Sequence, residues 1–225
     1  NVWTSGSLTS PLGPELSGII RGSEMREPYV EIDDFYNYAV RWYVPEIQIV
    51  SHVKERWTVI SLDTSDAIGR DDIGFVMTDA QTGGVLAAAD FNEINLFEFS
   101  KWISNFLIKF PKSVLVPEAR SSGRSIIDYV VLRLIEAGIN PFTRIYNTVV
   151  QNADSRPEDL ELIRGHRGMT TAAVIKFKKT FGFATSGSGD TSRNILYGRV
   201  LKAWATYCGR MAHDARLINQ VLSLV

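Results

Sequence analysis

Two short apolar stretches, each leading to a carboxylate, stand out in this sequence. One runs from residue 57 to Asp63, and the other runs from residue 113 to Glu118. Their lengths and β-branched residues are typical of buried strands. If the two strands are parallel neighbours, Asp63 and Glu118 lie close together. Two close carboxylates repel each other unless they share a proton or a divalent cation. Oxygen ligands of this kind suit Mg²⁺ or Mn²⁺.

The pattern between and after these strands predicts a sheet covered by helices. In chain order it predicts strands at 73–79 and 85–89, a helix at 96–110, the strand at 113–117 and a helix at 125–137. The turn at 81–84 has hairpin composition. The order β, β, β, α, β, α predicts an α/β fold with a mixed central sheet flanked by helices, because helical crossovers join parallel strands. In one common version of this topology, the first and fourth strands are parallel neighbours.

The two ends of the chain have weaker patterns. The first 30 residues are rich in Gly, Ser and Pro, which is typical of a linker, with one short helical piece near residues 15–21. Alternation over 38–44 predicts a strand, and 144–150 is a candidate fifth strand of the sheet. Helices are predicted at 157–164, 171–180, 194–205 and 214–224, with a Gly-, Ser- and Thr-rich loop at 182–192. We therefore assign residues 1–56 to a lead-in segment and residues 57–225 to the main domain.

Composition excludes some classes of protein. The 225 residues are 45% hydrophobic and 22% charged, as in ordinary globular proteins. No run approaches 18 apolar residues, so no membrane span is predicted. The single cysteine, Cys208, excludes an internal disulfide and a cysteine-cluster zinc site. Because the chain begins at Asn1 and not at Met, we interpret it as a fragment of a longer polypeptide.

Charge is distributed unevenly along the chain, although the net charge is only −1. Residues 1–100 carry 6 Lys and Arg against 16 Asp and Glu, whereas residues 101–225 carry 18 against 9. A basic half is consistent with a polyanionic partner, and it is also consistent with neutralisation between the two halves within the fold. The three histidines have no metal-ligand spacing, and no phosphate-binding glycine motif occurs.

The two carboxylate-ending strands resemble a known family. The residues that carry the resemblance are Ile60-Ser61-Leu62-Asp63 with Ser65, Gly69 and Asp71, and Val114-Leu115-Val116-Pro117-Glu118 with Ser121, Ser122 and Gly123. They are similar to the nuclease domain of tailed-phage terminase large subunits, within the ribonuclease H-like superfamily. The resemblance runs from about Trp57 to the end of the chain and is weaker across 140–180.

The resemblance implies roles for the acidic residues. Asp63 and Glu118 would be the first two metal-binding carboxylates of a two-metal site, and Asp71 matches an accessory acidic position. The family's third acid lies in a Gly-x-His-Asp-Asp stretch after the segment matching 217–225, and this chain has no such stretch. We therefore expect the domain to be truncated at its C-terminus, with Asp214 as an alternative ligand.

The function implied by the resemblance is a metal-dependent endonuclease. It would use Mg²⁺ or Mn²⁺ to cut concatemeric viral double-stranded DNA during genome packaging, in the host cytoplasm and outside the mature virion. Its partners would be DNA, the portal and the small terminase subunit, with no membrane. Residues 1–56 would be the tail of a preceding ATPase motor. Basic side chains that are candidates for DNA contact are Arg120, Arg124, Lys176, Lys178, Lys179 and Arg193.

Two alternatives remain open from the residues alone. One is another ribonuclease H-like nuclease of the resolvase or transposase type, which would prefer branched DNA. The other is a DNA-binding or docking module without catalysis, which the missing third acid favours.

Overall fold

The computed structural model describes residues 30–33, 39–64, 72–92, 94–120, 122–190, 192–211 and 213–223. Within these ranges a six-stranded mixed sheet has the order β1-β2-β5-β4-β3-β6. Its strands are β1 (Val30–Asp33), β2 (Ala39–Trp42), β3 (Thr58–Asp63), β4 (Ile73–Asp79), β5 (Val85–Phe91) and β6 (Ser113–Pro117).

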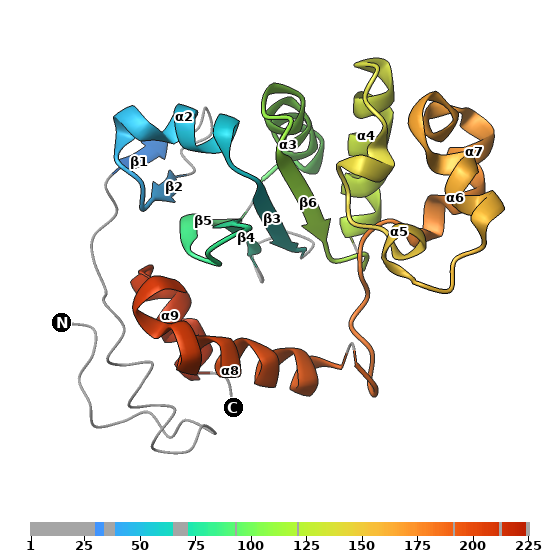
Figure 1. Cartoon of the computed structure of the whole chain (residues 1–225). Helices are drawn as coiled ribbons and strands as arrows, with labels where there is room; N and C mark the ends of the chain where they lie inside the picture. The colour runs from blue at the N-terminus through green and yellow to red at the C-terminus, as the bar shows by residue number, and fades with distance from the viewer. Residues whose placement is uncertain are drawn as a thin grey trace.

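Helices connect and flank these strands (Figure 1). The α-helices are α2 (Glu46–Glu55), α3 (Leu96–Lys109), α4 (Gly123–Glu136), α5 (Thr148–Gln151), α6 (Pro157–Ile163), α7 (Thr171–Phe177), α8 (Arg193–Met211) and α9 (Ala215–Ser223). Short 3₁₀ helices are η1 (Pro141–Thr143), η2 (Gly165–Met169) and η3 (Lys178–Thr180). Among the described helices, none is both long enough and apolar enough to cross a membrane.

The centre of the sheet has the predicted topology. Strands β3, β4 and β5 are consecutive and antiparallel, whereas β6 returns through α3 to pair with β3 in parallel. The predicted fold class, an α/β fold with a mixed central sheet flanked by helices, is therefore confirmed. Parallel pairing puts the carboxyl ends of β3 and β6 at the same edge of the sheet.

One face of the sheet forms the hydrophobic core with α2, α3 and α4, which lie together above the sheet in Figure 1. Helix α3 begins after Asn95, whose side chain accepts hydrogen bonds from the Phe97 and Glu98 amides, as an N-cap does. Its inward residues pack aromatic rings against the strands, for example Phe99 against Phe91 with ring centroids 5.2 Å apart.

The other face of the sheet carries the alternate residues of each strand and becomes polar toward its carboxyl edge. Helices α8 and α9 lie on this side, below the sheet in Figure 1. Ile218 on α9 is fully buried there. The sheet therefore has a packed apolar face and a second face whose strand ends carry charged side chains.

Residues 144–150 do not form the predicted fifth strand. Ile145 makes a single parallel bridge to Leu115, and the chain then turns into α5. Asn147 is the reason, because its side-chain oxygen accepts a hydrogen bond from the Val150 amide at 2.9 Å and so caps a helix. The predicted short helix near residues 15–21 lies outside the described residues.

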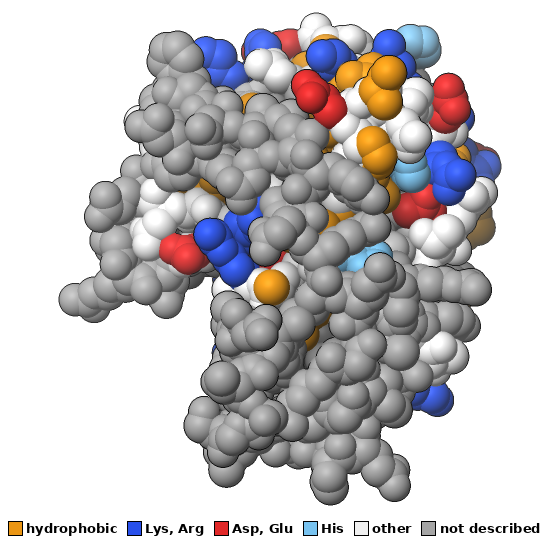
Figure 2. Space-filling model, turned by 90° about the vertical axis from the view of Figure 1, so that its left-hand side faces the viewer, with side chains coloured by type: hydrophobic (Ala, Val, Ile, Leu, Met, Phe, Trp, Pro, Cys, Tyr) orange, Lys and Arg blue, Asp and Glu red, His pale blue; other side chains and the backbone are white. Residues whose placement is uncertain are grey.

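The described part of residues 1–56 packs onto the main sheet. Strand β2 pairs with β5, and helix α2 buries Ile49 and Val53 in the core. Helix α2 was not predicted, because its buried residues are few. Figure 2, which views the molecule from the side of β1 and α2, shows basic, acidic and hydrophobic side chains interspersed at its top. The origin of this segment in an upstream domain stays a prediction.

Candidate functional site

The register of β3 and β6 places the two predicted catalytic carboxylates side by side. Leu62 is paired with Pro117, so Asp63 and Glu118 come next on adjacent parallel strands. The Glu118 amide donates to the Leu62 carbonyl at 2.9 Å, which continues the ladder beyond the end of β6. Neighbouring strands are about 4.8 Å apart, and residues at equivalent positions face the same side. The two carboxylates therefore share one face at the edge of the sheet.

Asp63 and Glu118 differ in their surroundings. Asp63 is exposed, whereas the Glu118 side chain is only 9% exposed. Glu118 Oε1 accepts a hydrogen bond of 2.8 Å from the Thr185 hydroxyl, and Arg120 Nε lies 3.8 Å from the same oxygen. Glu118 is thus held in one orientation, while Asp63 stays accessible to solvent.

The backbone around Glu118 is also fixed by close packing. The Thr64 hydroxyl donates to the Glu118 carbonyl at 3.1 Å. A Cβ added at Gly123 would lie 2.0 Å from that carbonyl oxygen, so only glycine fits at the start of α4. The Ala119 amide donates to the Phe183 carbonyl at 2.7 Å.

The segment after η3 closes one side of the site. Phe183 bridges Glu118 in parallel, and Thr185 follows two residues later. This approach needs Gly182, which has φ of 76° and leaves no room for a Cβ beside the Pro117 carbonyl oxygen, 2.8 Å away. The sequence predicts only a loop here and does not identify Thr185, because nothing local to residue 185 indicates that it reaches Glu118.

Asp214 contacts a strand of the sheet that is not next to the strands leading to Asp63 and Glu118. Its Oδ2 accepts hydrogen bonds from Arg41 Nε at 2.8 Å and from the Tyr43 hydroxyl at 2.7 Å, and its Oδ1 accepts from the Leu217 amide. Arg41 belongs to β2, which is separated from β3 by β5 and β4. Asp214 therefore caps α9 and ties it to the sheet, and this arrangement gives no support to Asp214 as a metal ligand.

Electrostatics keep Asp214 ionised in this position. Burial raises the pKa of its carboxyl, but the hydrogen bonds from Arg41, Leu217 and Tyr43 and the positive charge of Arg41 outweigh burial. The net pKa lies below its usual value. Burial and the hydrogen bond to Asp214 likewise raise the pKa of Tyr43. Arg41 also reaches Asp90 on β5 at 3.1 Å, so one guanidinium joins two carboxylates.

The six predicted DNA-contacting residues have different surroundings. Arg120 and Arg124 lie beside the site and donate to backbone carbonyls, Arg120 to Thr185 and Arg124 to Phe181 at 3.1 Å. Lys176 pairs with Asp159 at 2.6 Å and Lys178 with Asp128 of α4 at 2.7 Å.

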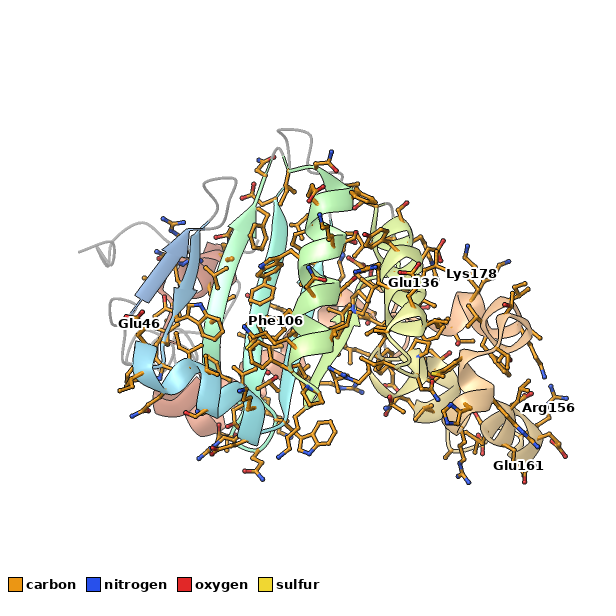
Figure 3. All side chains as sticks on the ribbon, turned by 90° about the horizontal axis from the view of Figure 1, so that it is seen from above. Glu46, Phe106, Glu136, Arg156, Glu161 and Lys178 are labelled. Carbon is orange, nitrogen blue, oxygen red and sulfur yellow. The ribbon has the colours of Figure 1, made fainter. Side chains whose placement is uncertain are left out.

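Figure 3 shows Lys178 beside α4, with Arg156 and Glu161 at the far end of the molecule. The side chains of Lys179 and Arg193 are exposed. DNA contact by any of these six residues stays a prediction, and the accessory Asp71 lies outside the described residues.

The chemistry of Asp63 and Glu118 fits a divalent cation. Mg²⁺ is commonly held by one or two carboxylates together with water and substrate phosphates. Within the described ranges, no set of three or more His, Cys, Asp and Glu side chains is arranged to hold a metal ion. The fit therefore rests on the paired carboxylates, with the substrate supplying further oxygen ligands.

The fold is similar to that of solved phage nucleases. Three structures of the large terminase nuclease from thermophilic phage G20c align with 14–16% identity and TM-scores of 0.35–0.37. The first covers 69% of this chain and 72% of its own, the magnesium-bound form 71% and 74%, and the zinc-bound form 85% and 98%. No protein-family model and no curated protein sequence matches this chain. This similarity assigns no function to the chain, so the site has to be judged from its own side chains.

Proposed function

We propose that this chain is a divalent-metal-dependent endonuclease that cuts double-stranded DNA during viral genome packaging. The observation that carries the proposal is the register of β3 and β6, which makes Asp63 and Glu118 neighbours on one face of the sheet edge. Carboxylates on rigid strand ends can hold the metal ions that assist phosphodiester hydrolysis in a fixed position. The motif resemblance around these same two residues supports phage DNA as the substrate.

The roles of the residues follow from their surroundings. Asp63 and Glu118 would hold Mg²⁺ or Mn²⁺, and a bound cation of this kind activates water and stabilises the leaving oxygen. Thr185 fixes the orientation of Glu118 through its hydroxyl. Arg120 lies at the rim, half exposed, where its charge favours the approach of a phosphate. The portal and the small terminase subunit are the proposed protein partners.

Cleavage of supercoiled plasmid tests the proposal. We expect wild-type protein to nick or linearise the plasmid with Mg²⁺ or Mn²⁺ and to be inactive with chelator. Asp63→Asn and Glu118→Gln preserve side-chain size but remove the negative charge, and each should lower the rate by about a thousandfold or more. Their melting temperatures should stay close to that of the wild type.

Two control variants show whether lost cleavage comes from loss of the proposed site or from loss of any negative charge on the surface. Asp154→Asn and Glu136→Gln change exposed carboxylates elsewhere, and they should cleave as the wild type does. Wild-type cleavage rates in both Asp63→Asn and Glu118→Gln would overturn the proposal. Metal-independent DNA binding without cutting would instead favour the non-catalytic DNA-binding module, and a strong preference for branched DNA would favour a resolvase-type nuclease.

A further inference from the structure

A gap in side chains lies next to Asp63 on the polar face of the sheet. Gly74 of β4 is paired with Asp63 on one side and with Asp90 of β5 on the other. A Cβ added at Gly74 would lie 3.7 Å from the Asp63 Cβ. A side chain at residue 74 would therefore lie on the same face of the sheet as Asp63. Glycine within a strand is typical of a place where a ligand approaches the backbone closely.

An open cleft of about 580 Å³ begins beside this gap. The sheet edge contributes Asp72, Asp90 and Asn92, and helix α9 contributes Arg216, Asn219 and Gln220. Asp90 is directly opposite Gly74, and Asp72 comes directly before β4, two residues before Gly74. The cleft therefore continues from the bare backbone at Gly74 toward α9.

The wall formed by α9 is held in place by buried polar contacts. Asp214, at the start of the helix, is fully buried and bonds to Arg41 and Tyr43 of the sheet side. Arg41 also holds Asp90 on the opposite wall of the cleft. The two walls are thus joined through one guanidinium, which keeps the width of the cleft fixed.

We infer that this cleft binds a nucleoside of the DNA strand next to the scissile phosphate. The inference rests on the proposed nuclease function. Gly74 is one strand and Asp90 two strands from Asp63, or about 5 and 10 Å at the usual strand spacing. Successive nucleotides rise by about 3.4 Å along a duplex strand. The cleft therefore contacts the DNA strand within a few nucleotides of the cleaved bond.

The chemistry of the lining favours a base and its sugar over a phosphate. The lining has no excess of positive charge to attract a phosphate, because Asp72 offsets the charge of Arg216 and Asp90 is paired with Arg41. Carboxamides carry both donors and acceptors and match the edges of bases in this way, and three of them, on Asn92, Asn219 and Gln220, line the cleft. Gly74 gives the sugar clearance over the sheet.

Filling the gap tests the inference. In Gly74→Leu the new side chain occupies the entrance of the cleft. We expect it to weaken binding of a short labelled duplex oligonucleotide by about tenfold or more, measured by fluorescence anisotropy with Ca²⁺ in place of Mg²⁺. Asn219→Ala removes one carboxamide, and it should weaken binding by about three- to tenfold. In the Gly74→Leu background, Asn219→Ala should have no further effect, because both act on one subsite.

Two controls exclude general effects. Ala137→Leu adds comparable bulk at an exposed position at the end of α4, on the other side of the sheet, and Gln48→Ala removes an exposed carboxamide from α2. Both should bind DNA as the wild type does. Melting temperatures of all variants would show whether Gly74→Leu remains folded, and Gly74→Ala, which the 3.7 Å contact accommodates, gives a milder form of the same test.

The outcomes separate this inference from the proposed function. If Gly74→Leu or Asn219→Ala binds DNA as tightly as the wild type, the nucleoside subsite is wrong even when Asp63→Asn abolishes cleavage. If both variants bind weakly but Asp63→Asn and Glu118→Gln still cut, the subsite stands and the carboxylate site is wrong. A wild-type protein that binds no DNA overturns both.

Discussion

At the scale of single residues, the site depends on one carboxylate that is held and one that is accessible. Glu118 receives the Thr185 hydroxyl from a segment 67 residues further along the chain, while Asp63 is exposed at its strand end. Groups that orient a ligand of a metal commonly change metal affinity by about 10- to 100-fold when they are removed. Thr185 is therefore a positioning residue for the proposed site.

Thr185→Val tests this role, because valine has nearly the same shape and no hydroxyl. We expect the concentration of Mg²⁺ or Mn²⁺ that half-activates cleavage to rise by about tenfold or more, with little change in the rate at saturating metal. Thr206→Val removes an exposed hydroxyl from α8 and serves as the control. An unchanged metal titration for Thr185→Val would show that its hydroxyl does not orient Glu118.

At the scale of elements, one buried arginine fixes the end of α3 relative to β6. Arg144 donates to the Leu107 and Phe110 carbonyls at 2.5 and 2.7 Å, and to the Ser113 carbonyl at 3.0 Å. The last carbonyls of a helix need partners outside the helix, and a cation is favoured there. Burial lowers the pKa of Arg144, which reflects the free-energy cost of keeping a charge in the interior. The position of β6, and so of Glu118, depends on this contact.

Replacing this arginine should destabilise the whole fold. Arg144→Met keeps much of the apolar volume but leaves buried carbonyls without their donor. We expect a loss of about 2–4 kcal/mol in the free energy of unfolding, measured by urea denaturation. Arg156→Met changes an exposed arginine that pairs with Asp159, and it should cost under about 1 kcal/mol. If Arg144→Met also lost less than about 1 kcal/mol in the free energy of unfolding, water would replace the guanidinium as the partner of these carbonyls.

At the scale of the whole molecule, α9 is attached to the sheet by a buried ionic contact. Arg41 and Asp214 are 173 residues apart, and their side chains meet at 2.8 Å. Because the folded-state pKa of Asp214 is lowered, this carboxylate stabilises the fold above its unfolded pKa of about 3.9. That contribution is lost as the pH falls through the folded pKa.

The lowered pKa of Asp214 predicts how the stability of Asp214→Asn, relative to the wild type, depends on pH. Near neutral pH, the variant should be less stable than the wild type by about 2–4 kcal/mol, because Arg41 loses the charge of its partner. The difference should shrink as the pH falls below about 4 and the wild-type carboxyl becomes protonated. Urea denaturation of both proteins between neutral pH and pH 3 measures it. Asp190→Asn, at an exposed carboxylate, is the control. A difference independent of pH would mean that the charge of Asp214 does not stabilise the fold.

The sequence by itself determined the strands and helices whose signals are local. The apolar runs of β3 and β6, the alternation of β4 and the helical spacing of α3 and α4 were predicted within a few residues, because burial on one face imposes a period on the chain. The α/β order then placed Asp63 and Glu118 at the same edge of the sheet. The same reasoning predicted a strand at 144–150, where the capping side chain of Asn147 favoured α5 instead.

Only the tertiary structure decided which distant residues meet. The contact of Thr185 with Glu118, the docking of α9 through Asp214 and the alignment of Gly74 between Asp63 and Asp90 join segments far apart in the chain. Such contacts leave no period in the sequence, since they depend on strand order, register and the paths of connecting segments. The sequence thus identified the pair of carboxylates, and the fold supplied the side chains that orient one of them and the cleft beside the other.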